Sequence, residues 1–226
     1  MIIPPPKLVN LWKVWTDRQP DDPALRVWAT ALGAWNPSWP AGAVVLEIGC
    51  ADTHWLTFAY QYDPTIRGVG IDWRNPQPGP GTRLKADVLT VDLPLASFDA
   101  IVMLSTIEHI GLGNYEHDPL DPDGDTHTMA RCVEWLKPGG WVYADVPYNP
   151  DGYRVVGKKH RIYDDEAIET RLTVPGLELG RAVATTLQGD LIDRPEKGAI
   201  LPGRRDFIYA AMTWWKKGEG HATQTP

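Results

Sequence analysis

Three acidic side chains lie at or near the ends of short apolar runs, where a carboxylate could hold a bound ligand. Glu47 lies in the run VVLEIG, Asp72 ends the run GVGID, and Asp87 follows LKA. In an open parallel sheet, ligands bind beyond the carboxyl ends of the strands, where the strand order reverses. The small residues Gly49 and Ala51 follow Glu47 and would let a ligand approach the backbone of a tight turn. The spacing predicts one crevice lined by acids, since capping or solvation would have to explain each carboxylate separately.

Two histidines could provide a general base for an acceptor hydroxyl. His109 lies in the segment STIEHIGLG, and His160 lies in the segment HRIYD. An imidazole with a pKa of about 6.5 can take up a proton at neutral pH. Each histidine could instead anchor a loop, because much of the rate of a transfer reaction can come from aligning the reactants. We expect His109 or His160 to act as the base if one is required.

The strands that position these residues are predicted from five β-rich apolar runs, at 44 to 49, 68 to 72, 84 to 88, 99 to 104 and 140 to 146. The segments between them are long enough for crossovers, so the alternation predicts a parallel sheet with helices on both faces. Two later runs, at 178 to 186 and 206 to 215, would complete seven strands, and a helix is expected to open at Asp164 and Asp165. The predicted fold is a Rossmann-like, doubly wound, mostly parallel seven-stranded α/β sheet.

The segments outside this pattern are predicted to be a helical cover, loops and a tail. Residues 7 to 18 and 23 to 35 have apolar positions at helical spacing. They predict a short N-terminal, Trp-rich helical layer over residues 1 to 41, followed by one domain at 42 to 217 and a disordered tail at 218 to 226. The early tryptophans could pack this layer onto the sheet or line a pocket for a planar or sugar-like acceptor. Loops are expected at 75 to 81, 111 to 125 and 149 to 161.

The composition limits the classes of function. At 226 residues with 43% hydrophobic composition, the chain is large enough for one α/β domain. A net charge of -7 disfavours sequence-independent binding to phosphates, so nucleic acid is not expected as a partner. Cys50 and Cys132 lack the spacing of a zinc site and the density of a disulfide scaffold. No stretch reaches the roughly 18 apolar residues that span a bilayer, and a cytoplasmic protein with no membrane partner is predicted.

The ordered motifs of the chain resemble those of class I S-adenosylmethionine-dependent methyltransferases. The resemblance covers residues 42 to 175 and rests on VVLEIGCADTHW, GVGID, LKADV, FDAIVMLSTIEH and LKPGGWVYADVPY, in that order. The motifs EHIGLG and DPDGD are similar to those of a little-characterised branch. Ala51 and Thr53 occupy positions where the family usually has glycine. A nicotinamide-binding protein could begin similarly, but it would need those glycines because a pyrophosphate lies directly on the turn.

The resemblance implies that S-adenosylmethionine is the cofactor. Asp72 would accept both ribose hydroxyls, while Asp87, or Asp92 as an alternative, would accept a hydrogen bond from the adenine amino group. The Trp73 ring could pack against the adenine or close the end of the sheet. The backbone N–H of Val88 would reach an adenine ring nitrogen, and the end of the fourth strand would line the methionine part. The implied cofactor-binding residues are Glu47, Gly49, Cys50, Ala51, Asp72, Trp73, Asp87, Val88, Leu104 and Ser105.

The acceptor side of the site is less closely specified by these motifs. In the branch that the chain resembles, Glu108 and His109 open a helix over the active site. The acidic loop does not fit a calcium-binding EF-hand, because Gly124 at the sixth loop position would place Pro119 and Ala130 where ligands are needed. A magnesium ion that holds a diol acceptor, or a Pro/Asp turn without metal, would also explain the acids. No metal ligand is assigned.

Two further segments bear on the acceptor. The tetrapeptide DVPY at 145 to 148 resembles the Asp-Pro-Pro-Tyr motif of amino-methylating nucleic-acid enzymes, but it follows the fifth run instead of the fourth. A basic cluster could cover the acceptor site or bind an anionic acceptor, and Arg161 within it could bind the acceptor or anchor a loop. The cluster consists of Arg154, Lys158, Lys159, His160 and Arg161.

The function that the resemblance implies is O-methylation of a hydroxyl on a sugar or other small molecule. Relatives with the EHIGLG and DPDGD pattern are similar to enzymes that modify glycans or small molecules, so a small-molecule or glycan acceptor is expected. N-methylation of a nucleic acid or protein is the first alternative. A non-catalytic module that binds the cofactor and a partner protein is the second, because the glycine turn is altered and tryptophans are abundant. The oligomeric state is left open.

Overall fold

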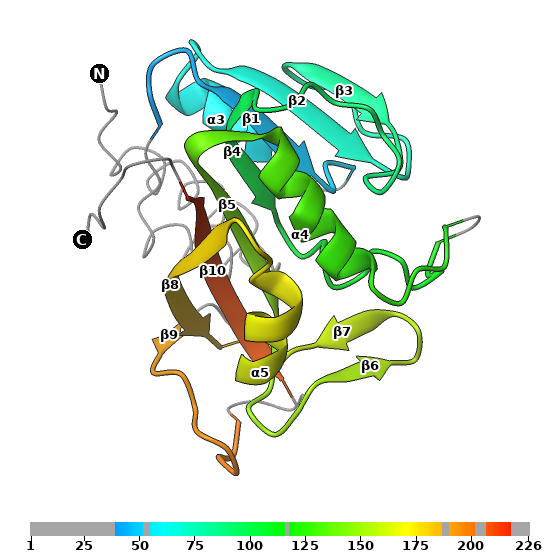
Figure 1. The fold of residues 1–226 in the computed structure, drawn as a ribbon, viewed down its shortest axis with the longest axis vertical. Helices are drawn as coiled ribbons and strands as arrows, with labels where there is room; N and C mark the ends of the chain where they lie inside the picture. Colours follow the sequence, from blue (N-terminus) through cyan, green and yellow to red (C-terminus); the bar gives the residue numbers. More distant parts are fainter. Residues whose placement is uncertain (1–38, 52–54, 116–117, 187–189, 202–206, 218–226) are drawn as a thin grey trace.

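Eight strands form one sheet in the part of the chain that the computed structural model describes, residues 39–51, 55–115, 118–186, 190–201 and 207–217 (Figure 1). The strand order is β3-β2-β1-β4-β5-β10-β8-β9. In chain order these strands are β1 (Val44–Ile48), β2 (Arg67–Asp72), β3 (Thr82–Lys85), β4 (Phe98–Met103), β5 (Leu136–Tyr148), β8 (Leu177–Thr185), β9 (Leu191–Ile192) and β10 (Ile208–Lys216).

The strand order reverses at β1, which creates the position where open α/β sheets bind ligands. β1 pairs in parallel with β2 on one side and with β4 on the other. β3 and β5 continue the parallel sheet outward from these two strands. β10 runs antiparallel to both β5 and β8. The prediction of a mostly parallel, doubly wound sheet is confirmed, and its seven strands are joined at the edge by the two-residue β9.

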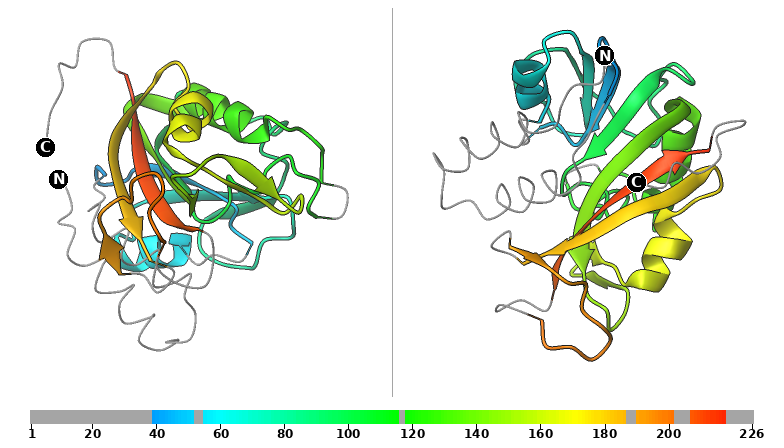
Figure 2. Two further views of the ribbon diagram at one scale, coloured as in Figure 1. Left: turned by 90° about the horizontal axis from the view of Figure 1, so that it is seen from below. Right: turned by 90° about the vertical axis from the view of Figure 1, so that its left-hand side faces the viewer.

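Both faces of the sheet are buried, as a parallel sheet requires. Neighbouring residues of β1 belong to different hydrophobic clusters, because successive side chains point to opposite faces. Val45 packs in the cluster that contains Trp55, at the start of helix α3 (Trp55–Tyr62). Leu46 packs in the cluster that contains Met129, from helix α4 (Gly124–Trp135). The two helices therefore cover opposite faces, as the views from two directions show (Figures 1 and 2).

Three local expectations differ from the structure. The third strand is β3, and it ends at Lys85, before the predicted end at residue 88, because the next residues enter a turn. Part of the predicted loop at 149 to 161 forms a hairpin of β6 (Arg154–Val156) and β7 (His160–Ile162). No helix opens at Glu108 and His109, which lie in consecutive turns instead.

The predicted helix after the hairpin is present but short. Helix α5 (Asp165–Ala167) is capped by Asp164, whose carboxylate accepts the backbone N–H of Ala167 at 2.8 Å. The chain continues as a single π-helical segment, η1 (Ile168–Leu172). The predicted N-terminal layer and the predicted tail lie outside the described residues, apart from 39 to 41. No helix among the described segments is long and apolar enough to cross a membrane.

Candidate active site

A cavity opens at the carboxyl ends of the central parallel strands. It contains about 560 Å³ of empty space, which includes open solvent. Arg74, Thr106, Tyr115 and Asp118, to which the sequence motifs assign no contact there, also lie in its wall. The residues in its wall that the sequence analysis assigned to the cofactor or to catalysis are Gly49, Asp72, Trp73, Asp87, Val88, Ser105 and His109.

Gly49 is required by the close approach of two loops at the base of the cavity. Its φ is +88°, and a Cβ at this position would lie 2.0 Å from the side-chain oxygen of Thr106. The backbone N–H of Gly49 donates to the carbonyl of Ile71 at 2.8 Å, which ties the turn after β1 to β2. The turn therefore brings backbone from β1 against the segment after β4, without room for a side chain.

Ser105 adopts a backbone conformation that is unusual for a residue with a side chain. Its φ is +42°, and such conformations cost of order 1–3 kcal/mol and persist only where the surrounding structure holds them. Asp145, fully buried in β5, accepts the backbone N–H of Ser105 at 3.3 Å and its hydroxyl at 3.1 Å. The acid of the DVPY segment thus holds the end of β4 in place. The sequence motifs did not reveal this role because it depends on the pairing of β4 with β5.

Asp72 is almost fully buried, and both of its carboxylate oxygens accept hydrogen bonds. One oxygen accepts the backbone N–H of Ala51 at 2.9 Å and the Nη2 of Arg74 at 3.4 Å. The other accepts the backbone N–H of Arg74 at 2.7 Å and its Nε at 3.3 Å. The Arg74 guanidinium also lies over the Tyr115 ring, 4.9 Å from its centre. Arg74 therefore covers the carboxylate that the sequence motifs assign to the ribose.

Asp87 lies in the cavity wall and also caps a turn. Its carboxylate accepts the backbone N–H of Leu89 at 2.9 Å and the Thr90 hydroxyl at 3.4 Å. Asp87 therefore caps a turn, which is the role that the sequence left open for an acid without a ligand. Each carboxylate oxygen has further acceptor capacity, so the two roles are compatible. The competing residue Asp92 is exposed and is not part of the cavity wall.

Four residues of the predicted cofactor set are buried beside the cavity and do not line it. Glu47 accepts the backbone N–H of Leu56 at 3.4 Å and so supports the first turn of α3. Burial raises the pKa of the Cys50 thiol to about 12, aided by the nearby Glu47 carboxylate. All four are at most 4% exposed: Glu47, Cys50, Ala51 and Leu104. These four residues support the cavity wall from the protein interior. Their direct contact with a cofactor stays a prediction.

His109 lies in the cavity wall, whereas His160 is not part of that wall. The Nδ1 of His109 is 2.5 Å from the carbonyl oxygen of Lys159 in the hairpin. The two imidazole rings are 6.2 Å apart, and the ring of His160 packs on Phe207 at 5.7 Å. Burial lowers the pKa of His109, even though the Lys159 carbonyl acts in the opposite direction. His109 is therefore neutral at pH 7 and can accept a proton.

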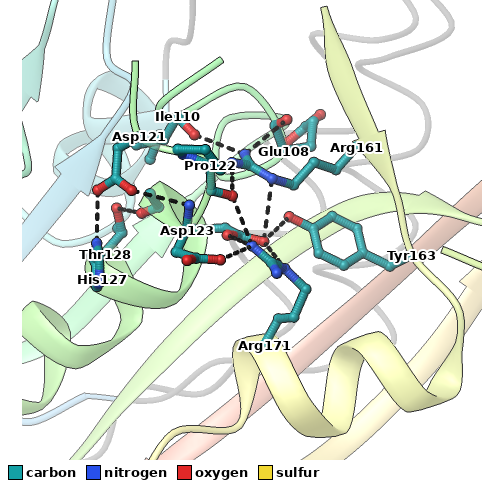
Figure 3. A network of polar contacts seen from close by, with 12 residues as sticks. Glu108, Ile110, Asp121, Pro122, Asp123, His127, Thr128, Arg161, Tyr163 and Arg171 are labelled. Atoms are coloured by element: carbon teal, nitrogen blue, oxygen red, sulfur yellow. Dashed lines mark hydrogen bonds and ion pairs between the residues drawn. The ribbon is translucent and has the colours of Figure 1, made fainter. Parts of the chain in front are cut away.

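A buried polar network anchors the turn that carries His109 (Figure 3). Arg161 is fully buried and donates to the carbonyls of Ile110 at 2.7 Å and Pro122 at 3.0 Å. Its backbone N–H donates to the carbonyl of Glu108 at 2.9 Å. Its Nε lies 3.5 Å from the Asp125 carboxylate. The structure therefore favours loop anchoring over acceptor binding for Arg161.

The acids of the loop and the start of α4 have partners within the protein, and two of them, Asp123 and Asp125, share Arg171. Asp121 lies 2.7 Å from the Nδ1 of His127, and Asp123 lies 3.1 Å from Arg171. Asp118 instead accepts the backbone N–H of Asn114 at 3.2 Å. These contacts are those of loop-stabilising side chains.

Comparison with known proteins identifies the fold. A family model described as "Caenorhabditis protein of unknown function, DUF268" matches residues 92–181. No curated protein matches the sequence. The structure is similar to the Haloferax volcanii protein that was solved in complex with the Trm112 methyltransferase activator, with a TM-score of 0.63, 16% identity and coverage of 93% of this chain and 98% of that one.

Two further solved structures have the same fold. The Burkholderia thailandensis 1,6-didemethyltoxoflavin-N1-methyltransferase, with bound 1,6-didemethyltoxoflavin and S-adenosylhomocysteine, has a TM-score of 0.60 at 15% identity and covers 92% of this chain and 85% of its own. SpnF, a cyclase, has a TM-score of 0.57 at 14% identity, and the match covers 93% of this chain and 81% of SpnF. The chain therefore has the fold of class I S-adenosylmethionine-dependent methyltransferases, as its motifs indicated. Because a cyclase shares this fold, the reaction must be argued from the site.

Proposed function

We propose that this chain, which has the class I methyltransferase fold, transfers a methyl group from S-adenosylmethionine to a hydroxyl of a sugar or other small molecule. The observation that supports this most directly is the cavity at the strand-order reversal, with Asp72, Asp87 and Ser105 in its wall. The Burkholderia methyltransferase of the same fold contains bound S-adenosylhomocysteine. The two cysteines are free, which is consistent with the proposed cytoplasmic location.

The residues in the wall fit an adenosine group. Asp72 has acceptor oxygens for the two ribose hydroxyls, provided that the Arg74 guanidinium moves away from the carboxylate. Asp87, Val88 and Trp73 lie in the cavity wall, which supports the proposed contacts of Asp87 and the Val88 N–H with the adenine edge and of the Trp73 ring with the adenine face. Gly49, also in the wall, lets the Thr106 side chain approach the turn after β1, where a Cβ would clash with it. The cavity wall thus offers carboxylates for hydroxyl and amino donors, and an apolar face for a ring.

The chemistry follows from one property of the cofactor, which supplies a methyl carbon bonded to a positively charged sulfur. When bound, the cofactor would give this methyl group to the acceptor oxygen, with the carbon–sulfur electron pair going to sulfur and S-adenosylhomocysteine as the product. His109 takes the hydroxyl proton at Nε2, since Nδ1 is held by the Lys159 carbonyl. His160 is the second candidate for the base, and the protein's remaining task is to align the reactants.

Two alternatives give different experimental results. An N-methyltransferase would transfer label from the cofactor to RNA or protein, whereas the proposed enzyme labels a small-molecule or glycan fraction. A non-catalytic module would bind the cofactor and a partner protein without transferring the methyl group. Incubation with methyl-labelled S-adenosylmethionine, followed by separation of glycan, small-molecule, RNA and protein fractions, distinguishes these cases. Label confined to RNA or protein would defeat the choice of acceptor.

Cofactor binding can be tested separately by calorimetry. Asp72→Asn is expected to weaken the affinity for S-adenosylhomocysteine at least about tenfold, because hydrogen bonds to a charged acceptor are worth about 1.5–3 kcal/mol. Asp92→Asn is the matched control, since Asp92 is exposed and lies outside the cavity wall. Equal affinities for the two variants would remove the ribose assignment of Asp72.

A further inference from the structure

The turn that carries His109 contains a buried carboxyl group, that of Glu108. The side chain is 2% exposed, and its Oε2 has no hydrogen-bond partner among the described residues. A carboxylate buried in this way is costly unless a cation neutralises it. Burial accordingly raises the pKa of Glu108 to about 8, although the Arg161 guanidinium acts in the opposite direction.

Arg161 does not neutralise Glu108 because its guanidinium is engaged elsewhere. Its Nη1 and Nη2 donate to the carbonyls of Ile110 and Pro122, and its Nε faces the Asp125 carboxylate. Arg161 contacts Glu108 only through the backbone carbonyl of that residue, which accepts the Arg161 backbone N–H at 2.9 Å and Nη1 at 3.5 Å. Arg161 therefore anchors the backbone of the turn (Figure 3). Among the described residues, the ion pair of the Glu108 carboxyl is the one with the His109 ring, which is charged only when that ring is protonated.

The neighbouring ring of His109 presents one particular nitrogen to this carboxyl. A carbonyl oxygen can only accept, so the contact with Lys159 places the proton of the neutral ring on Nδ1. Nε2 is then the nitrogen that can take up a proton. It lies 3.7 Å from the Oε1 of Glu108. The nitrogen that would receive the acceptor's proton is thus adjacent to a carboxyl that can change its own charge.

We propose that Glu108 is a positioning residue for His109, and that the charge on its buried carboxyl sets how readily the Nε2 of His109 takes a proton from the acceptor hydroxyl. This inference rests on the proposed function for its catalytic meaning. When Glu108 is a carboxylate, it compensates the positive charge that the ring gains with the proton. When Glu108 is protonated, that compensation is lost and the ring is a weaker base. The two groups titrate as a coupled pair.

Other charged groups around the pair come from several elements. Arg74, after β2, and Arg161, in β7, both disfavour a charged His109 ring. Asp118, from the loop, favours it and has the smallest effect of the three. Tyr163, after β7, interacts with Glu108, and burial keeps this phenol neutral because it raises its pKa far above the usual value. Asp118 is the carboxyl among these groups that favours a charged His109 ring, so it serves as the control.

The inference can be tested without knowing the acceptor, by nuclear magnetic resonance of ¹⁵N-histidine-labelled protein. The ring signals of His109 are assigned by their loss in His109→Gln. In the unmodified protein, the Nε2 signal is expected to shift in a step centred near pH 8, where Glu108 ionises. Glu108→Gln has the same shape but cannot ionise, and this step should disappear. Asp118→Asn should retain it.

The outcomes separate this inference from the proposed function. If the step of the His109 signal near pH 8 persists in Glu108→Gln, the coupling is overturned, whatever reaction the protein performs. The coupling is overturned equally if the unmodified protein shows no such step. ¹³C labelling of glutamate carboxyls gives a second measurement that does not depend on the variant folding. One carboxyl signal must shift with the same midpoint as the His109 ring, and its absence would also overturn the inference. Once an acceptor is known, the transfer rate should rise through pH 8 in the unmodified protein and stay level in Glu108→Gln.

Discussion

Asp125→Asn is expected to destabilise the protein strongly, because Asp125 is the buried acceptor for two arginines. Its side chain is 0% exposed, and its two oxygens lie 2.6 Å and 2.9 Å from nitrogens of Arg171. The Tyr163 hydroxyl donates to the second oxygen at 2.9 Å, and the Nε of Arg161 is 3.5 Å away. An asparagine keeps one acceptor oxygen, but its NH₂ group would face N–H or O–H donors of Arg171 or Tyr163. The substitution also leaves the buried Arg161 without the opposite charge of Asp125.

The expected loss of stability follows from the burial of Asp125 and Arg161, whose side chains are both 0% exposed. Removing one partner of a buried ion pair costs about 3–5 kcal/mol, mainly because the remaining charge stays out of water. In a chain of this size, that corresponds to a fall in melting temperature of roughly 6 to 20 °C. Asp123→Asn is the matched control. It removes a contact of 3.1 Å to the same Arg171, but its side chain is 61% exposed, so the expected loss is about 0–1 kcal/mol.

Urea denaturation followed by far-ultraviolet circular dichroism measures both variants. The free energy of unfolding should fall much more for Asp125→Asn than for Asp123→Asn, with similar slopes in urea. If the two variants lose the same amount, or if Asp125→Asn loses less than about 1 kcal/mol, the interpretation of the network as a buried anchor is wrong. The turn before α4 would then have to be held by hydrophobic packing instead.

Three further changes test the site. Arg74→Gln should tighten cofactor binding by about 1.5- to 5-fold in calorimetry, since it removes a partly exposed ion pair that the ribose must displace; weaker binding would show that Arg74 contacts the cofactor. Gly49→Ala should weaken cofactor binding far more than Gly139→Ala, because both have a positive φ but only the Cβ at Gly49 meets another residue; equal effects would leave backbone strain as the only cause. Because burial lowers the pKa of His109 from 6.5, protonation of its ring should cause a further decline in methyl transfer below about pH 6.5, separate from the step near pH 8 that is assigned to Glu108; His109→Gln should reduce the rate about 100-fold or more and remove the decline below pH 6.5. If the same change at His160 removes the decline instead, the base is His160.

The central strands and the acids at their ends could be predicted because the pattern that specifies them is local. β1, β2 and β4 are buried on both faces, so each appears in the sequence as a short, nearly continuous apolar run that ends in Gly, Asp or Ser. The edge strand β3 is mostly exposed and lacks such a run, and its predicted position was displaced toward Asp87. The β6–β7 hairpin was missed for the same reason, since Val155 and Val156 are exposed.

The acceptor side depended on contacts between residues that are far apart in the chain. His109 and Lys159 are 50 positions apart, and Arg161 reaches the carbonyl of Ile110 across 51 positions. In the sequence, Arg161 belongs to a basic segment of the kind that is usually exposed at the surface. Only the folded chain places it in a buried network with Asp125. The sequence by itself therefore determined the fold class, the central parallel strands and the acids beside the cavity, because hydrophobic periodicity specifies which residues enter the sheet. Only the tertiary structure decided which charged groups are buried and which atoms they contact, because the cost of burying a charge depends on all of the neighbours that surround it.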